Sequence, residues 1–143
     1  MITVELARPG HNAWVHIWHN EVFDEITIDE YLKWINQRNR RVYVVFSKGT
    51  GIGFAFVRLG RDAATICKIA IIGQFRRRGA ATEAVRQITA KHSKRLTRAA
   101  AKEPDAIAQD FFRSLGMRLK MVDGKPGERF WIFETTNKER AKR

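Results

Sequence analysis

The sequence predicts an α/β (α+β) protein whose central sheet is mixed and mostly antiparallel, with helices on both faces. β-like segments between residues 42 and 72 are joined by short glycine-containing turns, which is typical of antiparallel strands. From residue 64 to residue 115 strand-like and helix-like segments alternate, which favours a parallel pair with crossover helices. Two more strand-like segments then end the chain as a hairpin. We therefore expect six to seven strands and about four helices.

The first part of the chain is predicted to hold one strand and two helices. Residues 2–6 alternate apolar and polar side chains, as a half-buried strand does, and Pro9-Gly10 ends this strand. The apolar spacing over residues 11–20 predicts the first helix. Thr27 and Glu30 form a capping-box pattern, which predicts that the second helix begins there.

The middle of the chain is predicted to change from strand to helix after Gly73. Residues 42–47, 52–59 and 64–72 are rich in β-branched and aromatic side chains, and turn residues separate them at 48–51 and 60–62. These three strands should form an antiparallel meander. Beyond Gly73, apolar residues recur three or four positions apart, which predicts a helix from about residue 79 to residue 92.

The last part should hold a strand, a helix and a hairpin. Residues 95–101 give a weak strand signal of small side chains, and Asp105 is placed to cap a helix that ends at Gly116. Residues 117–122 and 128–134 predict the hairpin. We expect a single domain over residues 1–136, followed at 137–143 by a basic tail that is solvated and mobile.

Positive charge is concentrated in the middle of the sequence. The chain of 143 residues has 27 Lys and Arg against 15 Asp and Glu, a formal net charge of +12. Residues 74–102 contain nine basic residues and one acid, Glu83, whereas residues 1–39 contain three basic and six acidic residues. Such a field attracts anions, and its position predicts an anionic ligand at the middle of the chain.

Cysteine content and hydropathy bear on the cellular environment. Cys67 is the single cysteine, so no intramolecular disulfide can form and a reducing compartment suits the protein. The sequence shows neither a membrane-spanning stretch nor the layout of a signal peptide. We expect a cytoplasmic protein, a monomer or a homodimer, with no membrane partner.

The segment from Gly73 to Ala81 has the properties of an anion-binding loop. It leaves a strand, passes through the basic run 76–78, and enters a helix. The first backbone N–H groups of a helix have no internal partners, and the helix dipole adds partial positive charge there. Gly79 and the alanines that follow it leave room for an anion to approach those N–H groups. The physical prediction is a phosphate site.

Two motifs in this part of the chain resemble the GCN5-related N-acetyltransferase (GNAT) family. Arg76-x-x-Gly79-x-Ala81 resembles the pyrophosphate-binding motif of the family, which is Gln or Arg, x, x, Gly, x, Gly or Ala. Downstream, Asp105-x-x-Ala108-x-x-Phe111-Phe112-x-x-x-Gly116-Met117 resembles the late helix of the family. The two motifs together are more specific than either one. The motif resemblance covers about residues 64–122.

The resemblance implies a function and a set of site residues. The protein would transfer the acetyl group of acetyl-CoA to an amine on a small molecule or a protein, by direct attack, releasing coenzyme A. The backbone of Ile69 and Ile71 would pair with the pantetheine arm, and the loop would hold the pyrophosphate. The implied cofactor-binding residues are Ile69, Ile71, Gln74, Arg76, Arg77, Arg78, Gly79, Ala80 and Ala81.

The chain departs from the family pattern at two positions. Phe112 stands where many members have a tyrosine that protonates the departing thiolate, and a phenyl ring cannot donate a proton. Asp105 stands where an asparagine is common. Thiolate departure could be unassisted, or water or another group could assist it, or catalysis could be lost.

The sequence is compatible with more than one general base and more than one function. Glu21, Asp24, Glu25 and Asp105 are the candidate bases, and the first three could equally be a solvated acidic loop that attracts a cationic amine. A catalytically weak or inactive binding or structural protein of the same fold is one alternative function. Nucleic-acid binding through the positive charge is another. No metal site is expected, because His11, His16, His19 and His92 lack a ligand pattern.

Overall fold

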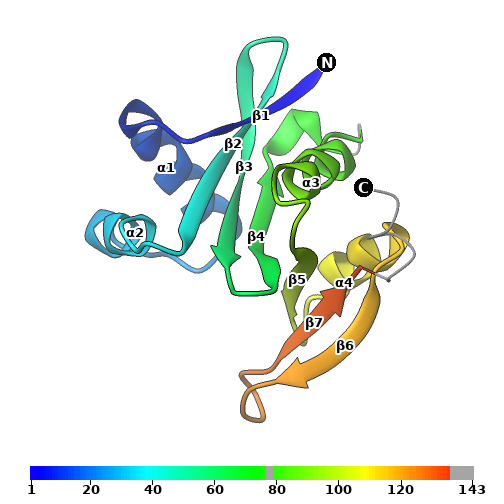
Figure 1. Ribbon diagram of the computed structural model, residues 1–143. Helices are drawn as coiled ribbons and strands as arrows, with labels where there is room; N and C mark the ends of the chain where they lie inside the picture. Colours follow the sequence, from blue (N-terminus) through cyan, green and yellow to red (C-terminus); the bar gives the residue numbers. More distant parts are fainter. Residues whose placement is uncertain (77–78, 136–143) are drawn as a thin grey trace.

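Seven strands of the described chain form one mixed sheet in the order β1-β2-β3-β4-β5-β7-β6 (Figure 1). The computed structural model describes residues 1–76 and 79–135. The strands are β1 (Ile2–Leu6), β2 (Arg40–Ser47), β3 (Thr50–Leu59), β4 (Ala63–Ile71), β5 (Leu96–Lys102), β6 (Arg118–Asp123) and β7 (Phe130–Glu134). The α-helices are α1 (Asn12–Val22), α2 (Ile28–Ile35), α3 (Ala80–Lys91) and α4 (Ala106–Ser114). The predicted fold class is confirmed.

The sheet is antiparallel except where β4 meets β5. β1 to β4 pair as an antiparallel meander, and β7 pairs antiparallel with both β5 and β6. β4 and β5 run parallel because α3 connects them as a crossover. The mixed character of the sheet therefore arises at one strand pair.

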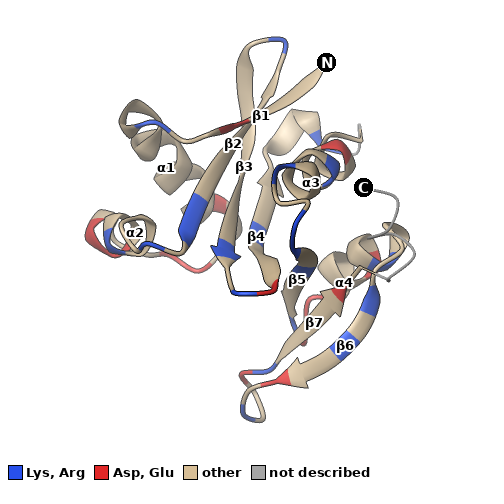
Figure 2. Cartoon of the chain, viewed as in Figure 1, with Lys and Arg blue, Asp and Glu red and all other residues tan. Residues whose placement is uncertain are grey.

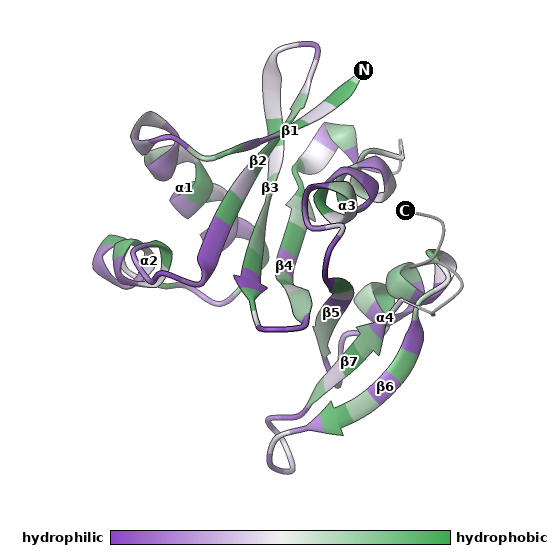
Figure 3. Cartoon of the chain, in the orientation of Figure 1, coloured by the Kyte–Doolittle hydropathy of each residue, from purple (hydrophilic) through white to green (hydrophobic). Residues whose placement is uncertain are grey.

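The helices cover the two faces of the sheet in pairs (Figure 1). α1 and α2 pack on one face over a cluster that includes Val15, Tyr31 and Phe54. α3 and α4 pack on the other face over a cluster that includes Ile66, Ile88 and Phe112. Apolar residues gather along the strands, whereas the connections are hydrophilic (Figure 3). Two cores, one on each face, thus hold the sheet between its helices.

Local sequence signals explain several element boundaries. Thr27 accepts a hydrogen bond from Glu30 N, and the Glu30 side chain accepts one from Thr27 N, so the predicted capping box is confirmed. Gly116 has a φ of +83° after α4, as the predicted C-terminal glycine requires. The β2–β3 turn is shorter than predicted: Lys48 and Gly49 both have positive φ, which suits a two-residue hairpin loop, so Thr50 already belongs to β3.

Two short 3-10 turns were not predicted. Pro9–His11 and Gly73–Phe75 each form one turn of 3-10 helix where the sequence indicated only a break. The weak strand signal at residues 95–101 does correspond to a strand, β5, shifted by one residue at each end. The predicted tail lies outside the described residues. No helix of the described residues is long and apolar enough to cross a membrane.

Candidate active site

β4 and β5 separate partway along their length. Ala63–Ile66 pair with Leu96–Ala99, and the register ends there. Beyond this point β4 continues to Ile71 paired with β3, and β5 continues to Lys102 paired with β7. After Ile66, the backbone N–H and C=O groups on the β5 side of β4 therefore form no hydrogen bonds with β5. Such an open strand edge can pair with an extended ligand.

A β-bulge marks the place where the strands part. Phe56 of β3 lies opposite Lys68, but Val57 lies opposite Ile66, so Cys67 is an extra residue on β4. A bulge bends the strand and increases its twist locally. Because the bulge and the end of the β4–β5 pairing coincide, it explains why β4 turns away from β5 here.

The predicted phosphate loop connects the open end of β4 to α3. Gly79 is the N-cap residue of α3 and has a φ of +77°, which glycine adopts without the strain of a Cβ. Among residues 1–76 and 79–135, no side chain caps this helix end, so its first N–H groups need other partners. Arg76 Nε donates to Ile71 O at 3.0 Å, which holds the loop against the strand end. Arg77 and Arg78 lie outside the described residues.

The remaining predicted cofactor residues divide into exposed and packed positions. Gln74 is exposed in the 3-10 turn. Ala80, at the start of α3, is buried in the core, and Ala81 is partly buried against the same core. Ile69 and Ile71 turn their side chains into the core shared with α3 and α4, so what they could offer a ligand is backbone. The cofactor-binding roles of these residues stay a prediction.

α4 packs beside β5, and hydrogen bonds connect the helix to the end of that strand. Gln109 Nε2 donates to Lys102 O at 3.1 Å and to Glu103 O at 2.7 Å. Asp105 caps the helix by accepting from Ala108 N at 3.0 Å, the structural role that the sequence also suggested. Phe112 is 3% exposed and contacts Phe111 and Phe133 by its ring, so it is a core residue on the α3–α4 face.

Asp24, in the connection between α1 and α2, lies on the other face of the sheet near the end of β5. Asp24 Oδ2 accepts a hydrogen bond from Lys102 Nζ at 3.0 Å, which brings the α1–α2 link over β5. That hydrogen bond lowers the pKa of Asp24, so its carboxylate is a weaker base. Glu25 is exposed on the same connection, whereas Glu21, which was predicted to lie between the helices, is exposed in the last turn of α1.

Sequence analysis missed a polar pair on this face, His19 and Lys68. His19 is fully buried on α1, and its Nε2 lies 2.6 Å from Lys68 Nζ, one residue beyond the bulge. Burial lowers the pKa of both side chains. A lysine inside the otherwise apolar run 66–72 is the signal that could have pointed to Lys68. Cys67, by contrast, has its thiol pKa raised by burial, which agrees with a packing role.

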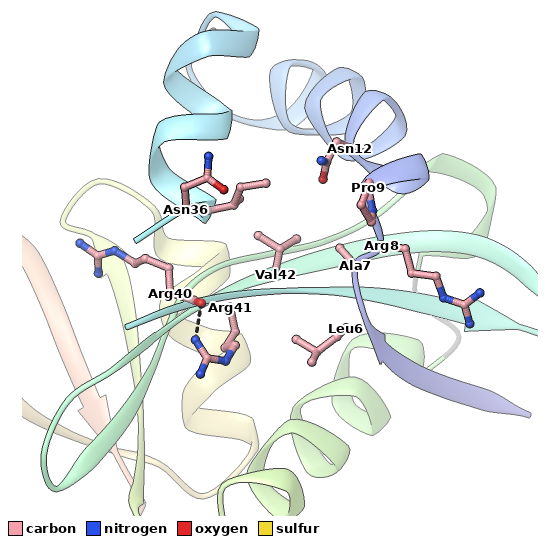
Figure 4. A pocket seen from close by; sticks show the side chains of 10 residues that line it. Leu6, Ala7, Arg8, Pro9, Asn12, Asn36, Arg40, Arg41 and Val42 are labelled. Atoms are coloured by element: carbon pink, nitrogen blue, oxygen red, sulfur yellow. Dashed lines mark hydrogen bonds between the residues drawn. The ribbon is translucent and has the colours of Figure 1, made fainter. Parts of the chain in front are cut away.

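Other features of the described surface are less suited to chemistry. A cavity of about 280 Å³ is lined by Arg8, Arg40 and Arg41, but their guanidinium groups point in different directions (Figure 4). Basic residues are spread over several elements in Figure 2. In residues 1–76 and 79–135, no group of three His, Cys, Asp or Glu side chains could hold a metal ion.

Comparison with known proteins gives a family and a fold. The model of the acetyltransferase (GNAT) family matches residues 8–117. No curated protein sequence matches the chain. Among solved structures, the ribosomal-protein-S18-alanine N-acetyltransferase from Escherichia coli is 14% identical and has a TM-score of 0.76, with 94% of this chain and 93% of that chain covered.

Two further structures have the same fold. NAA60 from Arabidopsis thaliana in complex with acetyl-CoA is 11% identical, with a TM-score of 0.75 and 96% and 99% of the two chains covered. A spermidine N-acetyltransferase SpeG chimera from Vibrio cholerae and hSSAT is 14% identical, with a TM-score of 0.79 and 99% of each chain covered. At these identities the likeness is one of fold.

Proposed function

Because the chain belongs to the acetyltransferase (GNAT) family, we propose that it transfers the acetyl group of acetyl-CoA to an amine by direct attack. The observation that carries the proposal is the separation of β4 from β5 beside the uncapped N-terminus of α3. An extended ligand arm could pair with the open edge of β4 while its phosphates meet the N-terminus of α3. Acetyl-CoA has both parts.

The cofactor site would use backbone groups more than side chains. The N–H groups at the start of α3 would bind the pyrophosphate, with Gly79 leaving the approach open. Gln74, Arg76 and the arginines at 77 and 78 would add polar and positive groups around it. Ile69 and Ile71 would contribute their backbone to the pantetheine arm.

Catalysis would rest mainly on holding the thioester and the amine together. The thioester carbonyl would lie near the bulge, where an N–H group of the open β4 edge, near Ile71 or closer to the bulge, would stabilise the developing oxyanion. The acceptor amine would arrive from the face of α1 and α2. It would lose its proton to Glu21, to Glu25 or to water, because Asp24 and Asp105 are already engaged.

The fold is compatible with more than one class of acceptor amine. The similar structures include proteins named for an alanine of a ribosomal protein and for spermidine, so the same fold serves protein and small-molecule amines. We propose an amine acceptor without choosing between these classes. Cytoplasmic location and a monomeric or homodimeric state remain parts of the same proposal.

The test combines cofactor binding with turnover. A thermal shift with acetyl-CoA should show stabilisation, since a ligand at one hundred times its Kd adds about 2.7 kcal/mol to the free energy of unfolding. Release of free thiol is then measured with a panel of polyamines, amino acids and peptide N-termini. Turnover of at least one amine supports the proposal, and failure to bind acetyl-CoA refutes it.

One observation favours a second candidate, a protein that binds the cofactor without turnover. Phe112 is a core residue with no proton to give, at the position where the family often has a tyrosine. Binding of acetyl-CoA with no thiol release from any amine would support this second function.

A further inference from the structure

Lys68 places a primary amine at the point where β4 and β5 part. It follows the bulge residue Cys67 on β4, and its side chain lies on the α1 face of the sheet. The ammonium is half-buried, with Nζ 5.3 Å from the ring centre of Phe23 and 5.7 Å from that of Phe56. The proposed thioester position is at this same bulge, so Lys68 lies beside it.

The hydrogen bonds around His19 fix which of its nitrogens carries the proton. Asn20 Oδ1 accepts from Ile26 N at 3.0 Å, and Asn20 Nδ2 donates to Ile26 O at 3.0 Å, so the orientation of the Asn20 amide is determined. Asn20 Oδ1 also lies 2.9 Å from His19 Nδ1. Because an amide oxygen can only accept a hydrogen bond, His19 Nδ1 must carry the proton. His19 Nε2 is left with a lone pair directed at Lys68 Nζ.

The charges near this pair leave the Lys68 ammonium without a carboxylate partner. Asp24 is the nearby acid, from the α1–α2 link, and its carboxylate pairs with Lys102 of β5. In the part of the chain that the structure describes, no carboxylate oxygen lies within 4.0 Å of Lys68 Nζ. His16 is the other titratable group near His19 on α1.

This environment activates a lysine as a nucleophile. Burial first, and then the charge of Lys102, lower the pKa of Lys68, so the neutral amine is more accessible than in water. Burial likewise lowers the pKa of His19 and keeps the imidazole neutral. A desolvated amine with an adjacent proton acceptor is the arrangement that makes lysine reactive toward carbonyl carbon.

We propose that Lys68 is a self-acetylation site, at which the protein transfers the acetyl group of its own bound acetyl-CoA to the Lys68 amine with His19 as the proton acceptor. This inference rests on the proposed function. Acetylation removes the ammonium beside the bulge and fills part of the acceptor face, so the modified protein turns over external amines more slowly.

Acetyl transfer to Lys68 removes two protons from its nitrogen, one to His19 and one to the departing thiolate. His19 Nε2 takes one proton from the Lys68 ammonium, and the lone pair of the neutral amine attacks the thioester carbonyl carbon. The N–C bond forms, the C–S bond breaks, and the thiolate leaves with the electron pair. The thiolate takes the second nitrogen proton, and His19 passes the first one to solvent. The products are acetyl-lysine, coenzyme A and one proton.

The test is peptide mass spectrometry on the full chain incubated with isotope-labelled acetyl-CoA. Lys33, exposed on α2, serves as the internal reference. Lys68 is expected to acquire label about tenfold or more faster than Lys33. His19→Gln and His19→Phe should each slow Lys68 labelling about 100-fold, since a positioned base contributes 10²–10⁴-fold, while Lys33 labelling stays unchanged. Lys68→Arg removes the labelled peptide, and Lys33→Arg leaves it.

A second acyl donor separates this inference from the proposed function. p-Nitrophenyl acetate needs no coenzyme site, so it reports the reactivity of the Lys68 amine alone. If acetyl-CoA fails to bind, the proposed function is refuted, and preferential labelling of Lys68 by p-nitrophenyl acetate still supports the activated amine. Labelling of Lys68 no faster than Lys33, in protein shown to bind acetyl-CoA, overturns the inference. So does unchanged Lys68 labelling in both His19 variants.

Discussion

Gly79→Glu should abolish acetyl-CoA binding while leaving the protein folded. Gly79 is exposed, and a Cβ built there meets nothing within 4 Å, so the new side chain has space. Its φ of +77° means that any Cβ costs about 1 kcal/mol of conformational energy. The carboxylate would stand at the N-terminus of α3, where it stabilises the helix by about 0.3–1 kcal/mol and occupies the place proposed for the phosphate.

The loss of affinity can be worked out from charge alone. Two like charges about 4 Å apart repel by about 4 kcal/mol at an effective dielectric constant of 20, which corresponds to about 1,000-fold in Kd. Because Gly79 is exposed, solvent screening reduces this value, and we expect at least about 100-fold weaker binding. Pantetheine, which has no pyrophosphate, should bind the wild type weakly and bind Gly79→Glu equally weakly.

Gly127→Glu is the matched control. Gly127 has a φ of +88°, and a Cβ there also meets nothing within 4 Å, but it lies between β6 and β7. Both variants should therefore lose a similar amount of stability, and Gly127→Glu should bind acetyl-CoA like the wild type. Titration calorimetry measures the affinities, and thermal unfolding checks the fold. Wild-type affinity in a folded Gly79→Glu protein would refute the phosphate site.

Four further perturbations test the core, the protonation of His92, the charge surplus and the role of Phe112. Gly53→Ala should lower the free energy of unfolding by about 2–3 kcal/mol, because the new Cβ would lie 2.3 Å from Ala70 O. Gly10→Ala is the control, because a Cβ at Gly10 meets nothing within 4 Å and should leave the free energy of unfolding unchanged. Urea unfolding measures both variants. Burial lowers the pKa of His92 below the ordinary value for histidine of about 6.5. The stability that its neutral form provides is therefore present above about pH 6.5 and is lost as the pH falls through the folded-state pKa. His92→Gln should flatten this dependence in urea titrations between about pH 5 and 8, and an unchanged slope would contradict the reasoning. With rising salt, affinity for duplex DNA should fall faster than affinity for acetyl-CoA, and tight sequence-specific DNA binding at physiological salt would support the nucleic-acid alternative. Phe112→Tyr should raise thiol release by less than about tenfold, and a gain within the 10²–10⁴ range of a positioned acid would show that protonation limits the wild type.

Elements whose signals are local were predictable from the sequence. The apolar runs of β2 to β4, the spacing along α3, and the caps at Thr27 and Asp105 all depend on neighbours within a few residues. The start of α3 after Gly79 was likewise predictable, because a glycine between a strand and a helix is a local pattern. The loop at residues 48–51 was predicted too long. Lys48 adopts a positive φ, which a lysine in the sequence does not indicate.

Features that depend on contacts between distant segments could not be predicted from the sequence. The length over which β4 pairs with β5 is set by the bulge at Cys67, which apolar periodicity does not reveal. His19 and Lys68 are 49 residues apart, and nothing in their spacing relates them. Asp24 was predicted as a candidate base or as part of a solvated acidic loop, and its contact with Lys102, 78 residues away in the sequence, is formed only in the folded chain.

The burial of Phe112 has a chemical consequence for the departing coenzyme A. Phe112 packs against Phe111 and Phe133, so the α3–α4 side of the open strand edge is apolar at this position. A thiol has a pKa near 8.5, so leaving as an unprotonated thiolate at pH 7.5 costs only about 1.4 kcal/mol relative to the thiol. An acid at position 112 could recover no more than about that energy at equilibrium, which is about tenfold in rate. Deprotonating the amine is the larger task, because a primary amine with a pKa near 10.4 lies about 3 units above that pH, or about 4 kcal/mol. Proton acceptors on the α1 face therefore have more to contribute than a proton donor on α4, and the lone pair of His19 Nε2 lies on that face.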